Sequence, residues 1–218
     1  MSTDNSNRKL TSSVGKPKTP IKILGSRPTD PNQIKSRQDL VKFFNIPTKD
    51  WDALVVCDGS ATTWERTAGW GAVIIQKTEV LPTVLSGSFS RGTNNVAELM
   101  GIFQALFYLA ENDFGLQERG YGVHVISDSQ YVVRGLNNLE KEGTIWAANS
   151  SSNRPIWMGI LGCRRKGLVI RGHYIPRDTI RPNRLCHDLA NFARIRAKHP
   201  QSDLAGAGWD LGQAMEND

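Results

Sequence analysis

The most constraining feature of this chain is a run of five apolar residues, Ala53-Leu54-Val55-Val56-Cys57, that ends on Asp58. A strand without polar alternation is buried on both faces, so other layers must cover both sides of its sheet. This requirement favours an α/β domain, in which helices supply the covering layers. The chain has 218 residues, of which 39% are hydrophobic and 22% charged, so it is long enough for one such domain with terminal extensions.

The spacing of apolar residues predicts the order of the elements. Continuous or alternating apolar stretches predict strands at 53–57, 69–75, 80–89, 123–127 and 168–174. Helical spacing predicts helices at 33–45, 95–110, 130–139, 157–161 and 184–198, with an irregular stretch at 140–156. Short links predict that the first three strands are antiparallel neighbours, and crossover helices predict that the later strands are parallel. We therefore predict an α/β fold with a mixed five-stranded sheet flanked by helices.

Charge is distributed unevenly along the chain. There are 27 Lys and Arg residues against 21 Asp and Glu, a formal charge of +6. Residues 1–50 hold ten basic and four acidic residues, which accounts for the whole excess. We predict a flexible basic tail at 1–35, a short docking helix or linker at 36–50, a domain at 51–198 and an acidic tail at 199–218. The basic segment predicts an anionic partner.

The domain itself is divided into an acidic and a basic half. Residues 51–150 carry six basic and eleven acidic residues, whereas residues 151–200 carry eleven basic and two acidic ones. The basic run Arg164-Arg165-Lys166, together with Arg171, predicts a shelf that holds phosphates beside an acidic site. A solvated edge is the alternative for this run.

The sequence gives no reason to expect a membrane-spanning, secreted or disulfide-rich protein. No apolar run approaches the roughly 18 to 20 residues of a membrane span, and the polar start MSTDNSNRKL lacks the apolar segment of a secretory signal. Cys57, Cys163 and Cys186 are widely spaced, so we expect neither a disulfide framework nor a zinc site. We expect no membrane partner and an intracellular, cytoplasmic location, with an organelle or the nucleus as alternatives.

Acidic residues stand where an open α/β sheet places its site. Asp58 ends the first predicted strand, Asp128 ends the fourth, and Glu98 falls in the first predicted turn of a helix. Clustered carboxylates repel one another, and bound divalent cations neutralise them. Oxygen ligands suit Mg²⁺ or Mn²⁺, and two such ions support phosphodiester cleavage.

Each acid also has a simpler interpretation. Asp128, or Ser129 after it, is a good helix cap, and Asn95 with Glu98 fits a capping box. Asp58 followed by glycine is typical of a turn. The three acids at equivalent positions of the chain favour a shared site over three separate explanations.

Five motifs, in order, resemble those of type 1 ribonuclease H. They are Cys57-Asp58-Gly59-Ser60, Gly69-Trp70-Gly71-Ala72, Gly92-Thr93-Asn94-Asn95-Val96-Ala97-Glu98-Leu99-Met100, Ser127-Asp128-Ser129-Gln130-Tyr131-Val132 and Asn183-Arg184-Leu185-Cys186-His187-Asp188-Leu189-Ala190. The resemblance spans residues 53 to 197. It implies the ribonuclease H-like fold and hydrolysis of the RNA strand of RNA–DNA hybrids with two divalent ions, Mg²⁺ or Mn²⁺.

The resemblance assigns roles by motif position. It implies metal ligands at Asp58, Glu98 and Asp128. It implies contacts with the two nucleic-acid backbones at Thr93, Asn94, Asn95 and Gln130. Trp146 resembles an aromatic residue of the family's substrate-binding handle, and covering the sheet edge is its alternative role.

The chain departs from the family at the fourth carboxylate. Four residues after Asn183, where the family has that carboxylate, stands His187, and Asp188 follows it. Adjacent residues point about 100 degrees apart around a helix, so the two cannot point the same way. Either His187 or Asp188 could complete the metal site as the fourth catalytic ligand. We favour His187, with Asp188 as its neighbour, and Asp188 as the ligand is the alternative.

Two residues before the last helix also resemble functional ones. His173 looks like the mobile histidine of the family, which helps the product leave or shuttles protons. Its alternative is a strand-end histidine hydrogen-bonded to a loop. Arg177 follows in a long loop, where we expect it to contact phosphate.

We therefore predict a divalent-metal-dependent endoribonuclease acting on RNA–DNA hybrids. We expect a monomer that works alone or with a replication-related protein partner. The alternatives are a DNA nuclease or resolvase of the same fold, and a catalytically degenerate nucleic-acid-binding subunit.

Deleting residues 1–35 tests the role given to the basic tail. The truncated chain should bind hybrid more weakly and with a flatter dependence on salt, because fewer counterions are released. The rate of cleavage at saturating substrate should not change. Hybrid affinity measured over a range of salt concentrations decides this, and equal affinities for the two chains would contradict the prediction.

Overall fold

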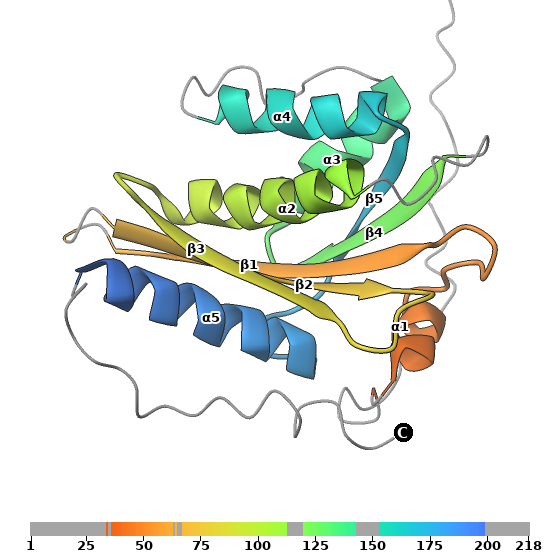
Figure 1. Ribbon diagram of the computed structural model, residues 1–218, viewed down its shortest axis with the longest axis horizontal. Coiled ribbons are helices and arrows are strands. Elements are labelled where there is room, and N and C mark those ends of the chain that lie inside the picture. The colour runs from red at the N-terminus through yellow and green to blue at the C-terminus, as the bar shows by residue number, and fades with distance from the viewer. Residues whose placement is uncertain are drawn as a thin grey trace, which may run out of the picture.

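The computed structural model describes residues 34, 36–62, 64, 67–112, 120–142 and 153–198. Trp146, the predicted acidic tail and, except for Ile34, the predicted basic tail lie outside these residues. Ten elements follow one another in the described part of the chain (Figure 1). Within that part, no helix combines the length and apolar composition that a membrane crossing requires.

Five strands form one mixed sheet in the order β3-β2-β1-β4-β5. The strands are β1 (Ala53–Ala61), β2 (Thr67–Gln76), β3 (Thr83–Ser90), β4 (Tyr121–Ser127) and β5 (Leu168–Tyr174). β1 and β3 pair antiparallel with β2, whereas β4 pairs parallel with β1 and β5. This arrangement confirms the predicted fold class.

Helices cover both faces of the sheet, as the apolar run in β1 requires. The helices are α1 (Arg37–Phe43), α2 (Asn94–Glu111), α3 (Gln130–Glu142), α4 (Arg154–Arg165) and α5 (Arg181–Lys198). Figure 1 shows α2, α3 and α4 on one side and α1 and α5 on the other. Val55 and Cys57 belong to the apolar core under α2, and Leu54 and Val56 belong to the core under α5.

The helix α1 joins the domain through a small apolar face. Ser36 caps it, because the Ser36 hydroxyl accepts from the backbone N–H of Asp39, whose carboxylate accepts in return from the backbone of Ser36. Leu40 and Val41 are buried, on the face of the sheet that α5 also covers. The helix is shorter than the predicted 33–45.

The starts of α4 and β3 differ from the prediction. The helix α4 begins at Arg154, inside the stretch 140–156 that was expected to be irregular, because Pro155 fits the first turn of a helix. β3 begins at Thr83 rather than at residue 80. Val80 and Leu81 lie in the β2–β3 connection and are 91% and 74% exposed, so their apolar character does not mark a strand.

The pairing of β1 with β4 brings two acids level. Its last matched pair is Val56 with Ile126. Asp58 and Asp128 each follow two residues later, at the same end of two parallel neighbours. β1 continues to Ala61 instead of ending at Asp58, because it remains paired with β2 after its pairing with β4 stops.

Two glycines of β2 let α5 lie directly against the sheet. A Cβ atom on Gly69 would lie 2.1 Å from the carbonyl oxygen of Ala190 and 2.6 Å from the backbone nitrogen of Arg194. A Cβ atom on Gly71 would lie 2.4 Å from the carbonyl oxygen of Cys186. The backbone of α5 therefore occupies the space that two side chains would fill.

This close approach changes which face of α5 is buried. Helical spacing in the sequence predicts that Leu185, Leu189, Phe192 and Ala193 point inward. Of these only Ala193 is buried, and the other buried residues of the helix are Asn183, Cys186 and Ala190. Small side chains fit the narrow gap over the glycines, and the larger ones lie at its margins.

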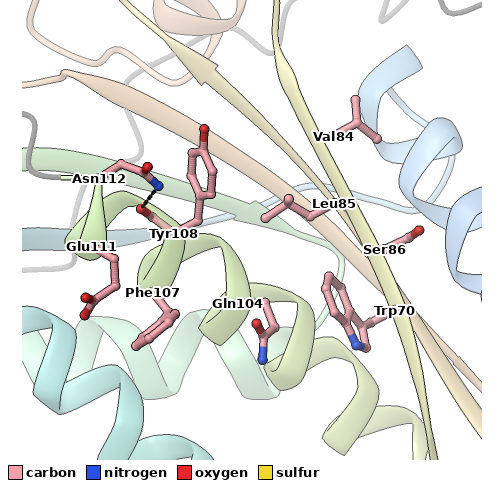
Figure 2. A pocket seen from close by; sticks show the side chains of 9 residues that line it. All are labelled: Trp70, Val84, Leu85, Ser86, Gln104, Phe107, Tyr108, Glu111 and Asn112. Carbon is pink, nitrogen blue, oxygen red and sulfur yellow. Dashed lines mark hydrogen bonds between the residues drawn. The ribbon is translucent and has the colours of Figure 1, made fainter.

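An open pocket of about 530 Å³ lies between α2 and the β2–β3 pair (Figure 2). Trp70, Leu85, Gln104 and Tyr108 are among its lining residues. None of the three acids lines it, so the predicted chemistry lies elsewhere. The cysteines, Cys57, Cys163 and Cys186, are buried free thiols.

Replacing Gly69 with alanine tests the contact between α5 and β2. The Gly69→Ala variant should lose about 1 to 3 kcal/mol of unfolding free energy, because the new methyl group meets backbone atoms that cannot move independently. Gly162→Ala is the matched control, since a Cβ atom there meets nothing within 4 Å and alanine favours the helix. Urea denaturation should give opposite signs for the two variants, and a neutral Gly69→Ala would contradict the packing argument.

Candidate active site

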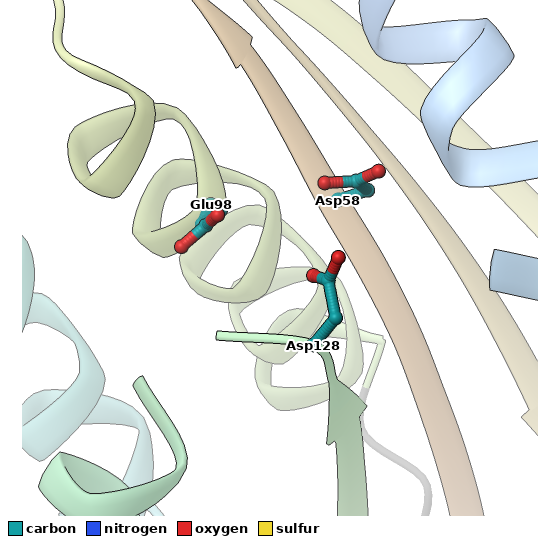
Figure 3. Close-up of side chains that lie close together, drawn as sticks. All are labelled: Asp58, Glu98 and Asp128. Carbon is teal, nitrogen blue, oxygen red and sulfur yellow. The ribbon is translucent and has the colours of Figure 1, made fainter. Parts of the chain in front are cut away.

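Three carboxylates converge beyond the paired ends of β1 and β4 (Figure 3). Asp58 lies on β1, Asp128 directly follows β4, and Glu98 projects from α2. One oxygen of each residue lies within 4.8 Å of the others. Asp58 and Glu98 are buried, and Asp128 is half-buried. The structure thus brings together the three acids that sequence reasoning singled out.

Capping explains none of the three acids. The Ser129 hydroxyl accepts from the backbone N–H of Val132 at 3.4 Å, so Ser129 caps α3. The carboxylate of Asp128 is therefore not required as a cap. Asp58 lies inside a strand rather than in a turn.

Glu98 lies in the second turn of α2, not in the first. The Thr93 hydroxyl accepts from the backbone N–H of Val96 at 3.4 Å, so the helix begins earlier than predicted. The alternative of a capping box between Asn95 and Glu98 is therefore wrong. Asn94 Nδ2 donates to Glu98 Oε1 at 2.9 Å and orients the carboxylate toward the cluster.

The cluster is electrostatically costly. Burial raises the pKa of Asp58, and the negative charge of Asp128 raises it further. Burial raises the pKa of Glu98 to about 7, with opposition from Ser129 and further increases from Asp128 and Asp58. The nearby guanidinium of Arg177 lowers both pKa values, although less than burial raises them.

Arg177 supplies the cation of the cluster in this structure. It lies in the loop between β5 and α5, where sequence reasoning placed a phosphate contact. Its Nε donates to Asp128 Oδ2 at 3.1 Å, and a terminal nitrogen lies 4.0 Å from Asp58 Oδ1. The side chain is 53% exposed, so it can leave the acids without unpacking the core.

His187 faces the cluster and Asp188 does not. His187 Nδ1 lies 3.0 Å from Asp58 Oδ2. Asp188 is exposed, as its different angle around α5 requires. Of the two candidates for the fourth position, the structure thus brings His187 to the carboxylates.

His173 is held inside the fold. Its Nε2 lies 2.7 Å from Nδ1 of His124, and its ring centroid lies 5.1 Å from that of Phe44. Burial lowers the pKa of His173 to about 4, and the neighbouring His124 and Arg171 lower it too. These contacts are with a strand and with the residue that ends α1, and a role in product release stays a prediction.

The basic run at the end of α4 does not flank the acids. Lys166 pairs with Glu111 at the last turn of α2, thirteen residues and therefore about 20 Å along the helix from Glu98. Arg171 lies 3.8 Å from Asp50. The predicted shelf beside the acidic site is wrong for these residues, because α4 ends at the far end of α2.

The remaining predicted substrate contacts lie at helix starts. Thr93, Asn94 and Asn95 are exposed at the start of α2, and Gln130 is exposed at the start of α3. Gln130 Oε1 accepts from Arg134 at 3.1 Å. Trp146 lies outside the described residues, so its predicted contact stays a prediction.

Comparison with known proteins identifies the family. The RNase H family profile matches residues 50–193. The chain belongs to the RNase H family. A curated relative, ribonuclease H of Neorickettsia sennetsu, is 28% identical over 124 residues, which are 56% of this chain and 71% of the relative.

Solved structures of RNase H proteins share the fold. LC11-RNase H1, solved in complex with an RNA/DNA hybrid, is 23% identical with a TM-score of 0.55, over 67% of this chain and 99% of that one. The N-terminal RNase H domain of a Mycobacterium tuberculosis protein is 21% identical with a TM-score of 0.52, over 68% and 96%. At these identities the likeness concerns the fold.

The acidic cluster of this RNase H protein fits a divalent metal. Its ligands are carboxylate oxygens, which Mg²⁺ and Mn²⁺ prefer. Among the described residues, Asp128 Oδ1 and Glu98 Oε2 are buried with no hydrogen-bond partner. Buried polar atoms are normally satisfied, and a cation held by both would satisfy them. Asp58, Glu98 and Asp128 could therefore hold a metal ion.

Sequence reasoning missed three residues beside the cluster. The Ser60 hydroxyl donates to Asn191 Oδ1 and accepts from Arg194 Nε, and Asn191 also contacts His187. The available signal was the spacing of 187, 191 and 194, which places these side chains on one face of a helix. That Ser60 on β1 is the partner of Asn191 and Arg194 could not be predicted without knowing how closely α5 approaches the sheet.

Replacing Glu98 with glutamine tests the electrostatic cost of the cluster. The raised pKa of about 7 means that the metal-free fold loses stability as the pH rises from 4.5 to 7. Over this range Glu98 ionises in the unfolded chain while the buried carboxyl keeps its proton. At pH 8 in EDTA, Glu98→Gln should be more stable than the wild type by on the order of 3 kcal/mol, and near pH 4 the difference should vanish. Urea denaturation at several pH values measures it.

The matched control is Glu111→Gln, at the exposed far end of α2. Its stability relative to the wild type should vary little over the same pH range, because exposed ion pairs contribute about 1 kcal/mol at most. A Glu98→Gln difference that does not depend on pH would refute the account of the cluster.

Proposed function

We propose that this protein is an endoribonuclease that hydrolyses the RNA strand of RNA–DNA hybrids. One observation carries the proposal: three buried carboxylates meet within 4.8 Å of one another in a chain of the RNase H family. The relative from Neorickettsia sennetsu is named ribonuclease H, which supports the substrate class. Cleavage would leave 3′-hydroxyl and 5′-phosphate ends.

The three acids would hold the metal ions, and Asn94 would orient one of these acids. Two divalent ions, Mg²⁺ or Mn²⁺, held by Asp58, Glu98 and Asp128, would activate water and stabilise the leaving oxygen of the phosphodiester. Asn94 holds the Glu98 carboxylate in place. The cluster is negative, so it attracts cations into a position next to the substrate backbone.

The guanidinium of Arg177 could pair either with the acids or with a phosphate of the substrate. In the described structure its guanidinium neutralises Asp128. A guanidinium binds phosphate oxygens in the same forked geometry as carboxylates. Once cations compensate the acids, Arg177 would be released to contact a phosphate of the hybrid, as the sequence predicted.

The N-termini of α2 and α3 form a surface on which the substrate backbone could bind. The first turns of α2 and α3 both begin beside the carboxylates, and unsatisfied backbone N–H groups at helix starts bind phosphate. Exposed Thr93, Asn94, Asn95 and Gln130 add hydrogen-bonding side chains there. A 2′-hydroxyl offers such groups both a donor and an acceptor, which is how protein groups distinguish RNA from DNA.

Replacing either aspartate by asparagine tests the proposal. Asp58→Asn and Asp128→Asn should each lower kcat on a hybrid at least about 100-fold while hybrid affinity stays within a few fold, because the charge that holds the cations is lost and the substrate surface remains. Glu111→Gln should keep wild-type kcat. Full activity in either aspartate variant would show that the cluster is not the active site.

The choice of substrate separates the alternatives. Wild-type protein should cleave a hybrid with Mg²⁺ or Mn²⁺ and leave duplex DNA, duplex RNA and branched DNA intact. Preferred cleavage of branched or duplex DNA would establish a DNA nuclease of the same fold. Tight hybrid binding without cleavage under either ion would establish a binding subunit.

A further inference from the structure

A chain of hydrogen bonds runs from α5 to the catalytic aspartate. His187, Asn191 and Arg194 lie on one face of α5, and Ser60 lies near the end of β1, two residues beyond Asp58. The distances are 3.1 Å from Arg194 Nε to Ser60 Oγ, 2.6 Å from Ser60 Oγ to Asn191 Oδ1 and 2.9 Å from Asn191 Nδ2 to His187 Nε2. The last link joins His187 Nδ1 to Asp58 Oδ2 at 3.0 Å.

The donors in this chain all point toward Asp58. A guanidinium can only donate, so Arg194 leaves the Ser60 hydroxyl hydrogen free to point at Asn191 Oδ1. The amide nitrogen of Asn191 then donates to His187 Nε2, which must be the unprotonated nitrogen. The proton of the neutral ring therefore lies on Nδ1, from which it is donated to Asp58 Oδ2.

We propose that Ser60 and Asn191 are positioning residues that hold His187 in its Nδ1–H form against Asp58. The proposal rests on the function proposed above and adds two residues that act on the Asp58 carboxylate through His187. Residues beyond the ligands commonly set the tautomer and orientation of histidines and carboxylates in metal sites, and their loss costs about 10- to 100-fold in affinity or activity.

This arrangement changes the role of His187. Both ring nitrogens are hydrogen-bonded, Nε2 to Asn191 and Nδ1 to Asp58. His187 therefore acts on the Asp58 carboxylate instead of offering an open nitrogen as a fourth ligand. Asp58 Oδ1 accepts from the backbone N–H of Gly59 at 2.7 Å, so each carboxylate oxygen carries one oriented hydrogen bond.

The close packing of α5 on the sheet fixes the geometry of this chain of hydrogen bonds, which we call the relay. The contact of the α5 backbone with Gly69 lies at Ala190 and Arg194, which flank Asn191 along the helix. Contact between the backbones of α5 and β2 therefore fixes where the Asn191 side chain starts, and its side-chain amide has little room to shift. A relay of four short links needs such a rigid support.

The tautomer of His187 can be read in metal-free protein. We would record long-range ¹H–¹⁵N spectra of the full chain in EDTA for the wild type, Ser60→Ala, Ser60→Thr and Asn191→Leu. The wild type and Ser60→Thr, which keeps the hydroxyl, should show a protonated Nδ1. Asn191→Leu and Ser60→Ala should show a larger share of the Nε2–H tautomer, because the Asp58 carboxylate is then the only one of the two partners that still selects Nδ1–H. Asn112→Leu, which removes an exposed amide at the end of α2, is the matched control.

Two further measurements report the consequence for the site. Binding of Mn²⁺ alone should weaken about tenfold in Asn191→Leu, and kcat on a hybrid should fall by a similar factor at unchanged KM. Ser60→Ala should show smaller losses and Ser60→Thr should recover them. Folded Asn191→Leu with the wild-type spectrum and wild-type Mn²⁺ affinity would overturn the proposal.

The outcomes separate this proposal from the proposed function. If Asn191→Leu does not fold, the pair Ser60→Ala and Ser60→Thr decides, and identical spectra for the two overturn the relay. If the wild type fails to cleave hybrids but the tautomer shifts as described, the relay stands and the proposed function fails. If hybrids are cleaved but no variant shifts the tautomer, the relay fails alone.

Discussion

Three carboxylates, two of them buried, lie within 4.8 Å of one another, and this arrangement is electrostatically costly. Neighbouring negative charges and burial both disfavour ionisation, and ionised oxygens are what a cation needs. The chain compensates by pointing donors at the acids from three elements: Asn94 of α2, Arg177 of the β5–α5 loop and His187 of α5. Both faces of the sheet are thereby tied to the same cluster.

Much of this arrangement could be predicted from the sequence. The apolar run before Asp58 required layers on both faces of the sheet, and the structure has them. The convergence of Asp58 and Asp128 followed from placing each at the end of a parallel strand, since strand ends in one sheet meet at one edge. Glu98 was placed by its motif, although its helix begins one residue earlier than predicted.

The remainder depended on packing that a linear pattern does not encode. Helical periodicity predicts that α5 has a buried stripe, but Gly69 and Gly71 decide that its small residues occupy it. The contact of Asn191 with Ser60 could be identified only once the close approach of α5 to β2 was known. The basic run ending at Lys166 was predicted to lie beside the acids, but it lies at the other end of α2, next to Glu111. A local run of charge does not show which end of a neighbouring helix it will contact.

Among the described elements, β1 at the centre of the sheet is the first strand to be synthesised, and α5, which covers one of its faces, is the last helix. His187 and Asp58 are 129 residues apart in sequence, and Asn191 and Ser60 are 131 apart. Contacts of such high sequence separation form slowly in folding. A nascent chain that lacks α5 therefore presents one face of its sheet that only α1 covers in part, and the bare backbone at Gly69 and Gly71 is exposed there. Protection of that face from other chains during synthesis is a demand that this topology places on the cell.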